Sequence, residues 1–412
     1  MPKPDQATDI LKTDILISGG GVAGLAAAAA FGAAGFSVIC VDPEAPATQE
    51  SDPRADLRTT AFLHPSIGVL TDAGLWDRLA PFATPLQVMR IVDAGGEHVD
   101  QARMTREFDA ADLSDKPFGW NLPNWLLRRE MVARLLELPN VDFRPGTATA
   151  TLFTRETEAR VTLSDGAQIV AKLVIAADGR NSPMREAAGI NVKTTDYGQK
   201  ALAFAVTHDL PHNNISTEIH RSGGPFTFVP LPDRPQPDGS TKHSSAIVWM
   251  ERTAEADRLC ALPIAEFETE MQARSTHLLG RLRLETRRSI WPMITQIAER
   301  FDGQRVALMA EAAHVIPPIG AQGLNMSLAD LTCLLALAKE TPGDLGSAKM
   351  LANYNRKRWY EVRAREAGID MLNRVSMLEP RPLRDLRAGV LGAIYGVKAI
   401  RKTLMRAGIG VR

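Results

Sequence analysis

Cysteine is scarce in this chain of 412 residues. The three cysteines, Cys40, Cys260 and Cys333, lie far apart in apolar surroundings and form no CxxC pair. This pattern excludes a disulfide framework and a cysteine-rich zinc site. We therefore expect no metal site, and the reducing cytoplasm is the compartment that fits best.

An excess of charge of one sign is also missing, because 48 Lys and Arg balance 48 Asp and Glu. A balanced chain exerts no overall attraction on nucleic acid, so none is expected as a partner. The polar N-terminus lacks the apolar core of a signal peptide, and we find no uncharged apolar stretch of the length that spans a bilayer. The 45% of hydrophobic residues still provides a large core, and the length predicts two or three domain-sized units.

A glycine-rich turn lies between two short apolar runs near the N-terminus. Residues 14–18 and 36–41 are predicted to be buried strands, and the alanine-rich residues 22–34 a helix, which together make one βαβ unit. The turn, Gly19-Gly20-Gly21-Val22-Ala23-Gly24, has the GxGxxG spacing of dinucleotide-binding folds.

Each glycine of that motif has a physical role. Gly19 permits the tight turn, Gly21 lets the backbone approach a pyrophosphate, and Gly24 lets helix and strand pack closely. The helix N-terminus presents free N–H groups to the phosphates, and Asp42, at the end of the second strand, is placed to accept hydrogen bonds from a ribose. The motif does not by itself separate FAD from NAD. The predicted cofactor-binding residues here are Gly19, Gly21, Val22, Ala23, Gly24 and Asp42.

Two later segments complete the pattern. Residues 177–185 follow a buried strand at 172–177 and contain Asp178; the alternative is an Asp-Gly turn whose Ser182 caps a helix that begins at Pro183. Residues 305–330 begin as a buried strand, pass Glu311 and a Pro-Pro loop, and continue into a helix. Glu311 is placed to accept a ribityl hydroxyl, and the loop amides and helix N-terminus to stabilise negative charge on a reduced flavin. His314 is more simply structural than catalytic.

In this order and spacing, the three segments resemble the flavoprotein aromatic hydroxylases typified by para-hydroxybenzoate hydroxylase, and most closely the ubiquinone-biosynthesis hydroxylases. The late segment is similar to the subfamily signature that ends in GQG-x-N before a helix. The DxR segment is matched by Asp56-Leu57-Arg58, and a cofactor-contacting arginine by Arg128, with Arg129 as the competing match. The resemblance adds as cofactor-binding residues Arg58, Arg128, Asp178, Glu311, Pro318, Gly320, Gln322, Gly323, Leu324 and Asn325.

The chain departs from the family pattern at two positions. The family reads GD before AAH, whereas this chain has Ala310-Glu311; the family's GGQG is Gly320-Ala321-Gln322-Gly323. Glu311 keeps a carboxylate but adds a methylene, and the methyl of Ala321 narrows the tolerance for a close backbone approach. These changes affect the expected geometry around the flavin and leave the cofactor class unchanged.

The resemblance implies an α/β fold with a Rossmann-like FAD-binding domain, an inserted antiparallel-sheet substrate domain and a C-terminal helical tail. It implies FAD-dependent hydroxylation of an aromatic ring, with a prenylated phenol of ubiquinone biosynthesis as substrate. Reduced FAD would react with molecular oxygen to give a C4a-hydroperoxide that water must not reach, and NADPH or NADH would act as the transient reductant. Candidate walls of the substrate site are Phe204, Phe228 and Trp249, for which a place in the core is the alternative.

The expected domains are 1–195 with 292–345 for FAD, exchanging some strands with the substrate sheet at 196–291, and a basic helical region at 346–412. Between Leu351 and Arg412 there are 14 Lys and Arg against 5 Asp and Glu. This tail is predicted either as a solvated surface helix or as a peripheral contact with the inner face of an anionic membrane. Further expected partners are a second copy of the chain or a quinone-synthesis complex. The rival functions are a flavin-dependent prenyl reductase and a non-catalytic scaffold of such a complex that retains the fold.

Overall fold

The computed structural model describes residues 10–94, 104–221, 223–236 and 238–376. The last part of the basic tail lies outside these ranges, including its cationic residues Lys398, Arg401, Lys402 and Arg406 and its apolar residues Val397, Ile400 and Leu404. The predicted helical region between 346 and 412 is therefore described only as far as residue 376.

The first sheet has the strand of the glycine turn near its centre. The strand order is β18-β19-β11-β1-β2-β8, with β10 and β9 attached beside β11. The pairs from β19 to β8 are parallel, as in a doubly wound nucleotide-binding fold. The strands are β1 (Ile10–Ser18), β2 (Val38–Asp42), β8 (Val141–Pro145), β9 (Thr149–Thr154), β10 (Ala159–Leu163), β11 (Gln168–Ala176), β18 (Asp302–Gly303) and β19 (Val306–Leu308).

The second sheet is the predicted, mainly antiparallel one. Its order is β20-β17-β12-β15-β14-β13-β5-β6, with β16 paired to β12, and only β13 and β5 run parallel among its described pairs. Strands from outside 196–291 join it at both edges. The predicted division into domains stays a prediction. The strands are β5 (Val88–Asp93), β6 (Met104–Asp109), β12 (Val192–His208), β13 (Ile215–His220), β14 (Pro225–Pro235), β15 (Thr241–Arg252), β16 (Leu282–Leu284), β17 (Ser289–Ala298) and β20 (His314–Val315).

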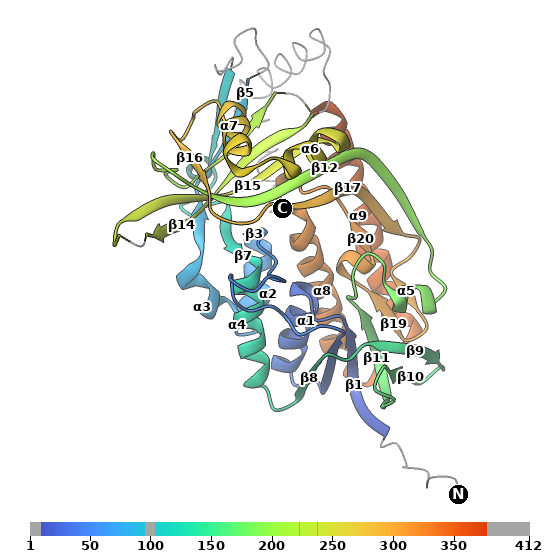
Figure 1. Ribbon diagram of the computed structural model, residues 1–412. Helices are drawn as coiled ribbons and strands as arrows, with labels where there is room; N and C mark the ends of the chain where they lie inside the picture. The colour runs from blue at the N-terminus through green and yellow to red at the C-terminus, as the bar shows by residue number, and fades with distance from the viewer. Residues whose placement is uncertain (1–9, 95–103, 222, 237, 377–412) are drawn as a thin grey trace, which may run out of the picture.

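A third, small sheet connects the two large ones, with β7 between β3 and β4. Its strands are β3 (Thr59–Leu63), β4 (Thr84–Leu86) and β7 (Gly119–Pro123). In Figure 1 the large antiparallel sheet crosses the top of the molecule, the parallel sheet lies at the bottom, and most of the long helices lie between them.

The first helix, α1, begins at Val22 as predicted and ends at Ala33, one residue before the predicted end. Between residues 64 and 79 there are two helices, because Gly74 follows the first of them with a positive φ of 70°. The α-helices are α1 (Val22–Ala33), α2 (His64–Asp72), α3 (Trp76–Leu79), α4 (Asn124–Leu136), α5 (Pro183–Ala187), α6 (Thr253–Ala261), α7 (Ile264–Arg274), α8 (Gln322–Glu340) and α9 (Ala348–Ser376). The 3₁₀ turns are η1 (Ala80–Phe82), η2 (Ala110–Asp112), η3 (Ala310–Ala312), η4 (Ile319–Ala321) and η5 (Pro342–Asp344).

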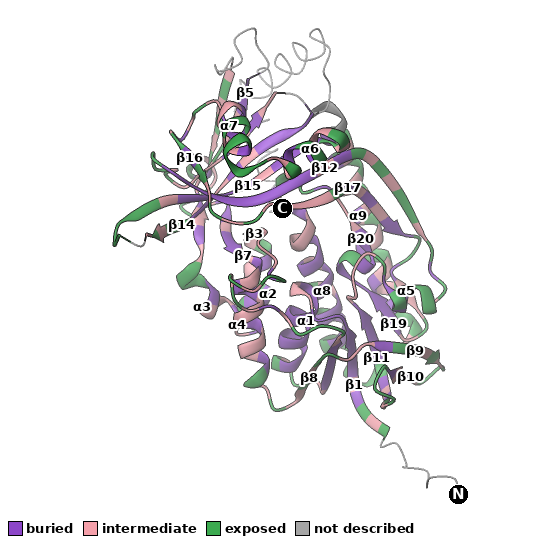
Figure 2. Ribbon diagram, viewed as in Figure 1, coloured by how far each residue is buried: buried purple, intermediate pink, exposed green. Residues whose placement is uncertain are grey.

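The core is built on α1 and the second half of β1, where residues 23–32 and 15–18 are buried, as Figure 2 shows in purple. The small side chains of α1 let it pack against α4 and α8 as well as against the strands. The stretch Ile319–Glu340 is long and apolar enough, by length and composition alone, to cross a membrane. Because α8 supplies several side chains to the main hydrophobic cluster, we interpret this stretch as a core helix.

Candidate active site

The backbone of the glycine turn is tightly packed at Gly19 and Gly24 and open at Gly21. A Cβ at Gly19 would lie 2.3 Å from the carbonyl oxygen of Ala177, and one at Gly24 would lie 1.9 Å from that of Gly19. At Gly21 a Cβ would meet nothing within 4 Å, and no side chain caps the N-terminus of α1 there. The free N–H groups of α1 therefore face open space, which is the arrangement that binds a phosphate.

Asp42 lies at the end of β2 and braces this turn. One carboxylate oxygen accepts the N–H of Gly20 at 2.6 Å, and the other accepts the N–H of Glu44 at 2.8 Å. Each oxygen has a further lone pair, so the carboxylate can still accept a ribose hydroxyl.

The segment 177–185 is tied to the first motif. Asp178 accepts hydrogen bonds from the hydroxyls of Ser182 and Ser18 and from the N–H of Met184. Burial raises the pKa of Asp178, and these hydrogen bonds only partly oppose the effect. The predicted Ser182 cap of α5 is present, because its hydroxyl accepts the N–H of Arg185.

Arg185 connects this segment to the third motif, since it donates to the carbonyl of Ala312 at 3.0 Å. The three segments that are far apart in the sequence therefore meet at the carboxyl ends of β1, β11 and β19. This edge of a parallel sheet is where such folds bind ligands.

The two alanines that replace family glycines both have a left-handed backbone. Ala310 has a φ of 56°, as does Ala321, which directly precedes α8. A non-glycine residue in this region is strained, and such strain concentrates at functional sites. Glu311 is exposed beside Ala310, so its carboxylate is available to a ligand.

Asn325 holds the start of α8 in place. Its side-chain oxygen accepts from the N–H of Leu63 and the hydroxyl of Ser66, and its nitrogen donates to the carbonyls of Ala61 and Ala321. The structure thus gives Asn325 a structural role within the predicted site.

Arg58 lies between the flavin-binding segments and the large sheet. It forms a bidentate ion pair with Asp56, at 2.7 and 2.8 Å, and its guanidinium lies 4.6 Å from the ring centroid of Trp291 on β17. Burial would raise the pKa of Asp56, but the hydrogen bonds and charge of Arg58 outweigh it and lower that pKa to about 2. The charge of Glu311 also acts on Arg58.

Arg128 and Arg129 face different surroundings. The Nε of Arg128 is buried and has no hydrogen-bond partner among the described residues. Arg129 pairs with Glu130 and lies over the rings of Phe82 and Trp125. A buried donor without a partner is costly, so Arg128 is the arginine that a phosphate would satisfy.

Comparison with known proteins agrees with this geometry. The family model described as "FAD binding domain" matches residues 12–366. The chain belongs to this family. It is 32% identical to the ubiquinone hydroxylase UbiL of Rhodospirillum rubrum, covering 96% of this chain and 89% of the relative. It is 27% identical to the 3-demethoxyubiquinol 3-hydroxylase of Escherichia coli, covering 97% and 99%. The fold is similar to p-nitrophenol 4-monooxygenase from Pseudomonas putida, with a TM-score of 0.77, 20% identity and coverage of 98% and 100%.

The family confirms FAD as the cofactor and the α/β fold with an antiparallel substrate sheet. The residues present fit this cofactor, because the open space above Gly21 and the unpaired Nε of Arg128 provide two donor sets for a pyrophosphate. The predicted contacts of individual residues with FAD stay predictions.

A buried ion network, which the sequence did not reveal, supports the loop at residues 310–321, which we call the flavin loop. Asp330 on α8 is completely buried and accepts from His314 at 2.6 Å, from Arg358 on α9 at 2.8 Å, and from the N–H of Ala310 at 3.1 Å. Burial raises the pKa of Asp330, but the interactions with His314 and Arg358 outweigh this and lower it. His314 is therefore structural, in line with the simpler of its two interpretations.

The large sheet has one face covered by α6 and α7, and the three predicted wall residues lie on that face. Phe204, Phe228 and Trp249 are 1%, 1% and 3% exposed and pack with Phe267 of α7 in a separate hydrophobic cluster. We therefore withdraw them from the substrate site; their alternative interpretation as core residues is the one that the packing supports.

Successive side chains of a strand point to opposite faces, so the neighbours of those aromatic residues point the other way. The register aligns Trp291, Ala201 and Met250 in one row across β17, β12 and β15, and Ala203 with Val248 in the next. Because Arg58 contacts Trp291, this is the face turned toward the flavin-binding segments. We call it the flavin-side face.

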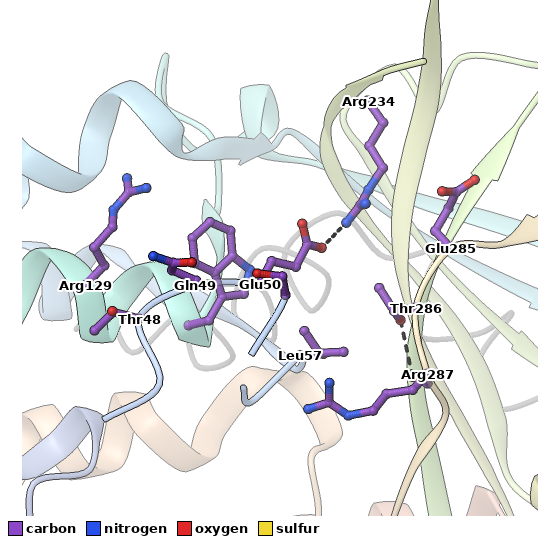
Figure 3. A pocket seen from close by; sticks show the side chains of 11 residues that line it. Thr48, Gln49, Glu50, Leu57, Arg129, Arg234, Glu285, Thr286 and Arg287 are labelled. Atoms are coloured by element: carbon purple, nitrogen blue, oxygen red, sulfur yellow. Dashed lines mark hydrogen bonds and ion pairs between the residues drawn. The ribbon is translucent and has the colours of Figure 1, made fainter. Parts of the chain in front are cut away.

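A cavity of about 710 Å³ opens where the segment 48–57 meets α4 and the large sheet (Figure 3). Three arginines and two glutamates line it; Arg234 is paired with Glu50 and Arg129 with Glu130, which leaves the lining with a small excess of positive charge. Arginine side chains are suited to bind an anionic group such as a phosphate. The lining residues are Thr48, Gln49, Glu50, Ser51, Leu57, Trp125, Arg129, Arg234, Glu285, Thr286 and Arg287.

Proposed function

We propose that this protein uses FAD, molecular oxygen and NADPH or NADH to hydroxylate the aromatic ring of a prenylated phenol in ubiquinone biosynthesis. The observation that carries the proposal is the meeting of the three motif segments in one site. It is supported by relatives, matched over most of their length, that are named ubiquinone hydroxylase and 3-demethoxyubiquinol 3-hydroxylase.

Bound and reduced FAD supplies the oxygen-activating chemistry. The chain holds the dinucleotide through the amides at Gly21 and the carboxylate of Asp42, and Arg128 neutralises phosphate charge. At the other end, the N-terminus of α8 places its first amides beside the strained Ala321, where they stabilise negative charge.

The flavin-side face of the large sheet provides the substrate wall. Its central side chains are small or flexible, with Ala201, Ala203, Val248 and Met250 side by side. This apolar surface binds a prenyl chain and keeps water away from the reacting oxygen.

The arginine-lined cavity is where we place the phosphates of the nicotinamide reductant. The described residues contain one glycine turn of the dinucleotide-binding type, so the reductant binds on the surface and leaves after transferring hydride. We place the protein in the cytoplasm; peripheral contact with the membrane, a second copy or a quinone-synthesis complex belongs to the same proposal.

Purification tests the proposal directly. We expect a yellow protein that consumes NAD(P)H and oxygen when 2-geranylphenol is added and converts it to a product heavier by one oxygen atom. A reductase would instead convert a prenyl double bond without consuming oxygen, and a scaffold would be colourless and bind no added FAD. Either result contradicts the proposal. A strain that lacks the gene should accumulate an under-hydroxylated quinone precursor.

A further inference from the structure

A histidine and a glutamate lie together on the flavin-side face of the large sheet. Nε2 of His220 is 2.7 Å from a carboxylate oxygen of Glu218, two residues earlier on β13. Residues two apart on a strand share a face. Glu218 is opposite Thr227 on β14, which is opposite Val248 on β15, so both polar side chains belong to the flavin-side face.

The flavin-side face is anchored to its cover at both ends of the strands. At one end of the strands, Asn121 on β7 donates to the carbonyl of Pro230. At the other end, Asn373 on α9 donates to the side chain of Gln199, which in turn donates to the carbonyl of Gly223. The rows that contain Val248, Glu218 and His220 lie between these two anchors.

One ring nitrogen of His220 is paired with Glu218, and the other has no hydrogen-bond partner among the described residues. That second nitrogen, Nδ1, is buried, and the side chain is 12% exposed. Burial alone would raise the pKa of the Glu218 carboxyl, but its interaction with His220 outweighs burial and lowers that pKa. In a neutral imidazole that donates from Nε2–H to this carboxylate, the lone pair lies on Nδ1.

Among the described residues, the charged groups aligned with the dyad on the neighbouring strands are Asp93, opposite His220 on β5, and Arg106, which lies across β5 on β6. The ion pair at 2.7 Å makes Glu218 the direct partner of the imidazole.

We propose that Glu218 and His220 form the polar end of the substrate site, where Nδ1 of His220 accepts the hydroxyl proton of the phenol. The O–H bond of the phenol breaks, its electron pair stays on the oxygen, and the new N–H bond makes an imidazolium that the carboxylate of Glu218 stabilises. The phenolate is the more electron-rich ring and the better acceptor of oxygen. This proposal rests on the proposed function.

The test compares two phenols in the flavin-loaded enzyme: 2-geranylphenol and its more acidic 6-fluoro derivative. We expect His220→Asn to lower kcat/KM for 2-geranylphenol by about 100-fold, the low end of general-base effects, and to lower it much less for the fluorinated phenol, which ionises without help. The rising limb of the wild-type pH profile should disappear. Glu218→Gln should lower the rate by about 10-fold, with the same ranking of the two phenols.

His243→Asn is the matched control, because His243 is also paired with a carboxylate, that of Asp233, at an exposed position of the same sheet. It should behave like the wild type. Equal losses for the two phenols in His220→Asn, or a loss below threefold, would overturn the proposal; if that variant does not fold, Glu218→Gln decides by the same criteria.

Binding is measured separately through quenching of flavin fluorescence by each phenol. If the wild type hydroxylates neither phenol, the proposed function fails, and binding alone then decides the role of the dyad. At least tenfold weaker binding in His220→Asn than in His243→Asn supports that role, and equal binding refutes it.

Discussion

The two left-handed alanines give a prediction of unusual sign, since replacing alanine by glycine normally destabilises a protein. Ala321 is partly exposed and has a φ of 56°. Removing its Cβ relieves about 1–2 kcal/mol of left-handed strain, while the freer unfolded chain costs about 0.4–1 kcal/mol. Ala321→Gly should therefore stabilise the protein by about 0.5–1 kcal/mol.

Ala310 has the same φ but is buried. Its methyl group contributes about 0.8 kcal/mol of burial, so Ala310→Gly should leave the stability nearly unchanged. Ala352, exposed within α9, is the control with ordinary helical geometry. Ala352→Gly should destabilise by about 1 kcal/mol.

The measurement is the free energy of unfolding of the apoprotein from denaturant titration, repeated with saturating FAD. The order of stability should be Ala321→Gly, then Ala310→Gly, then Ala352→Gly. If Ala321→Gly is as destabilising as Ala352→Gly, the reasoning from backbone strain is refuted.

Three further predictions concern the cofactor site. Gly21→Ala should fold normally but bind FAD at least tenfold more weakly, because its Cβ would enter only the open space where the cofactor binds. Gly24→Ala should also lower the melting temperature of the protein, because its Cβ would overlap a backbone carbonyl. Equal effects of the two substitutions on FAD titration and on melting temperature would contradict this prediction. Asp330→Asn should destabilise by about 3–5 kcal/mol, because it leaves buried cationic partners uncompensated, and a shift below 1 kcal/mol in chemical unfolding would count against the network. The pKa of Asp56 is lowered to about 2, so its contribution to stability is complete above the unfolded pKa near 3.8 and is lost as the pH falls toward 2; Asp56→Asn should flatten this part of the pH–stability curve.

Structure that depends on neighbouring residues could be predicted from the sequence, whereas the pairing of strands that are far apart in the chain could not. The GxGxxG turn specifies its own conformation within six residues, and the structure agrees with the strand, helix and strand around it. The polar composition of residues 50–66 is typical of a loop and does not reveal β3, which is stabilised by pairing with β7 and by contact with α8. The polar residues 192–200 likewise do not show a strand pattern, and this first half of β12 is stabilised by pairing with β17.

The identity of the two sheet faces was beyond sequence reasoning. Alternation shows that Phe204 and Ala203 point to opposite sides, but only the packing of α6 and α7 decides which side is core. The larger aromatic side chains looked like the better ligand wall, while the small ones were the ones turned toward the flavin. The pairing of Asp330 with Arg358 could not be predicted either, because 28 residues separate the two in the sequence and only the packing of α8 against α9 brings them together.

The ion pair between Asp330 and Arg358 also sets the time at which the site can be completed during synthesis. The parallel sheet cannot add β19 before residue 308 leaves the ribosome, and the flavin loop lacks its support until Arg358 on α9 follows. The large antiparallel sheet, most of which is made earlier, folds while the nucleotide domain is still incomplete. FAD is therefore captured only after α9 has been made, and a chain truncated before α9 would be colourless.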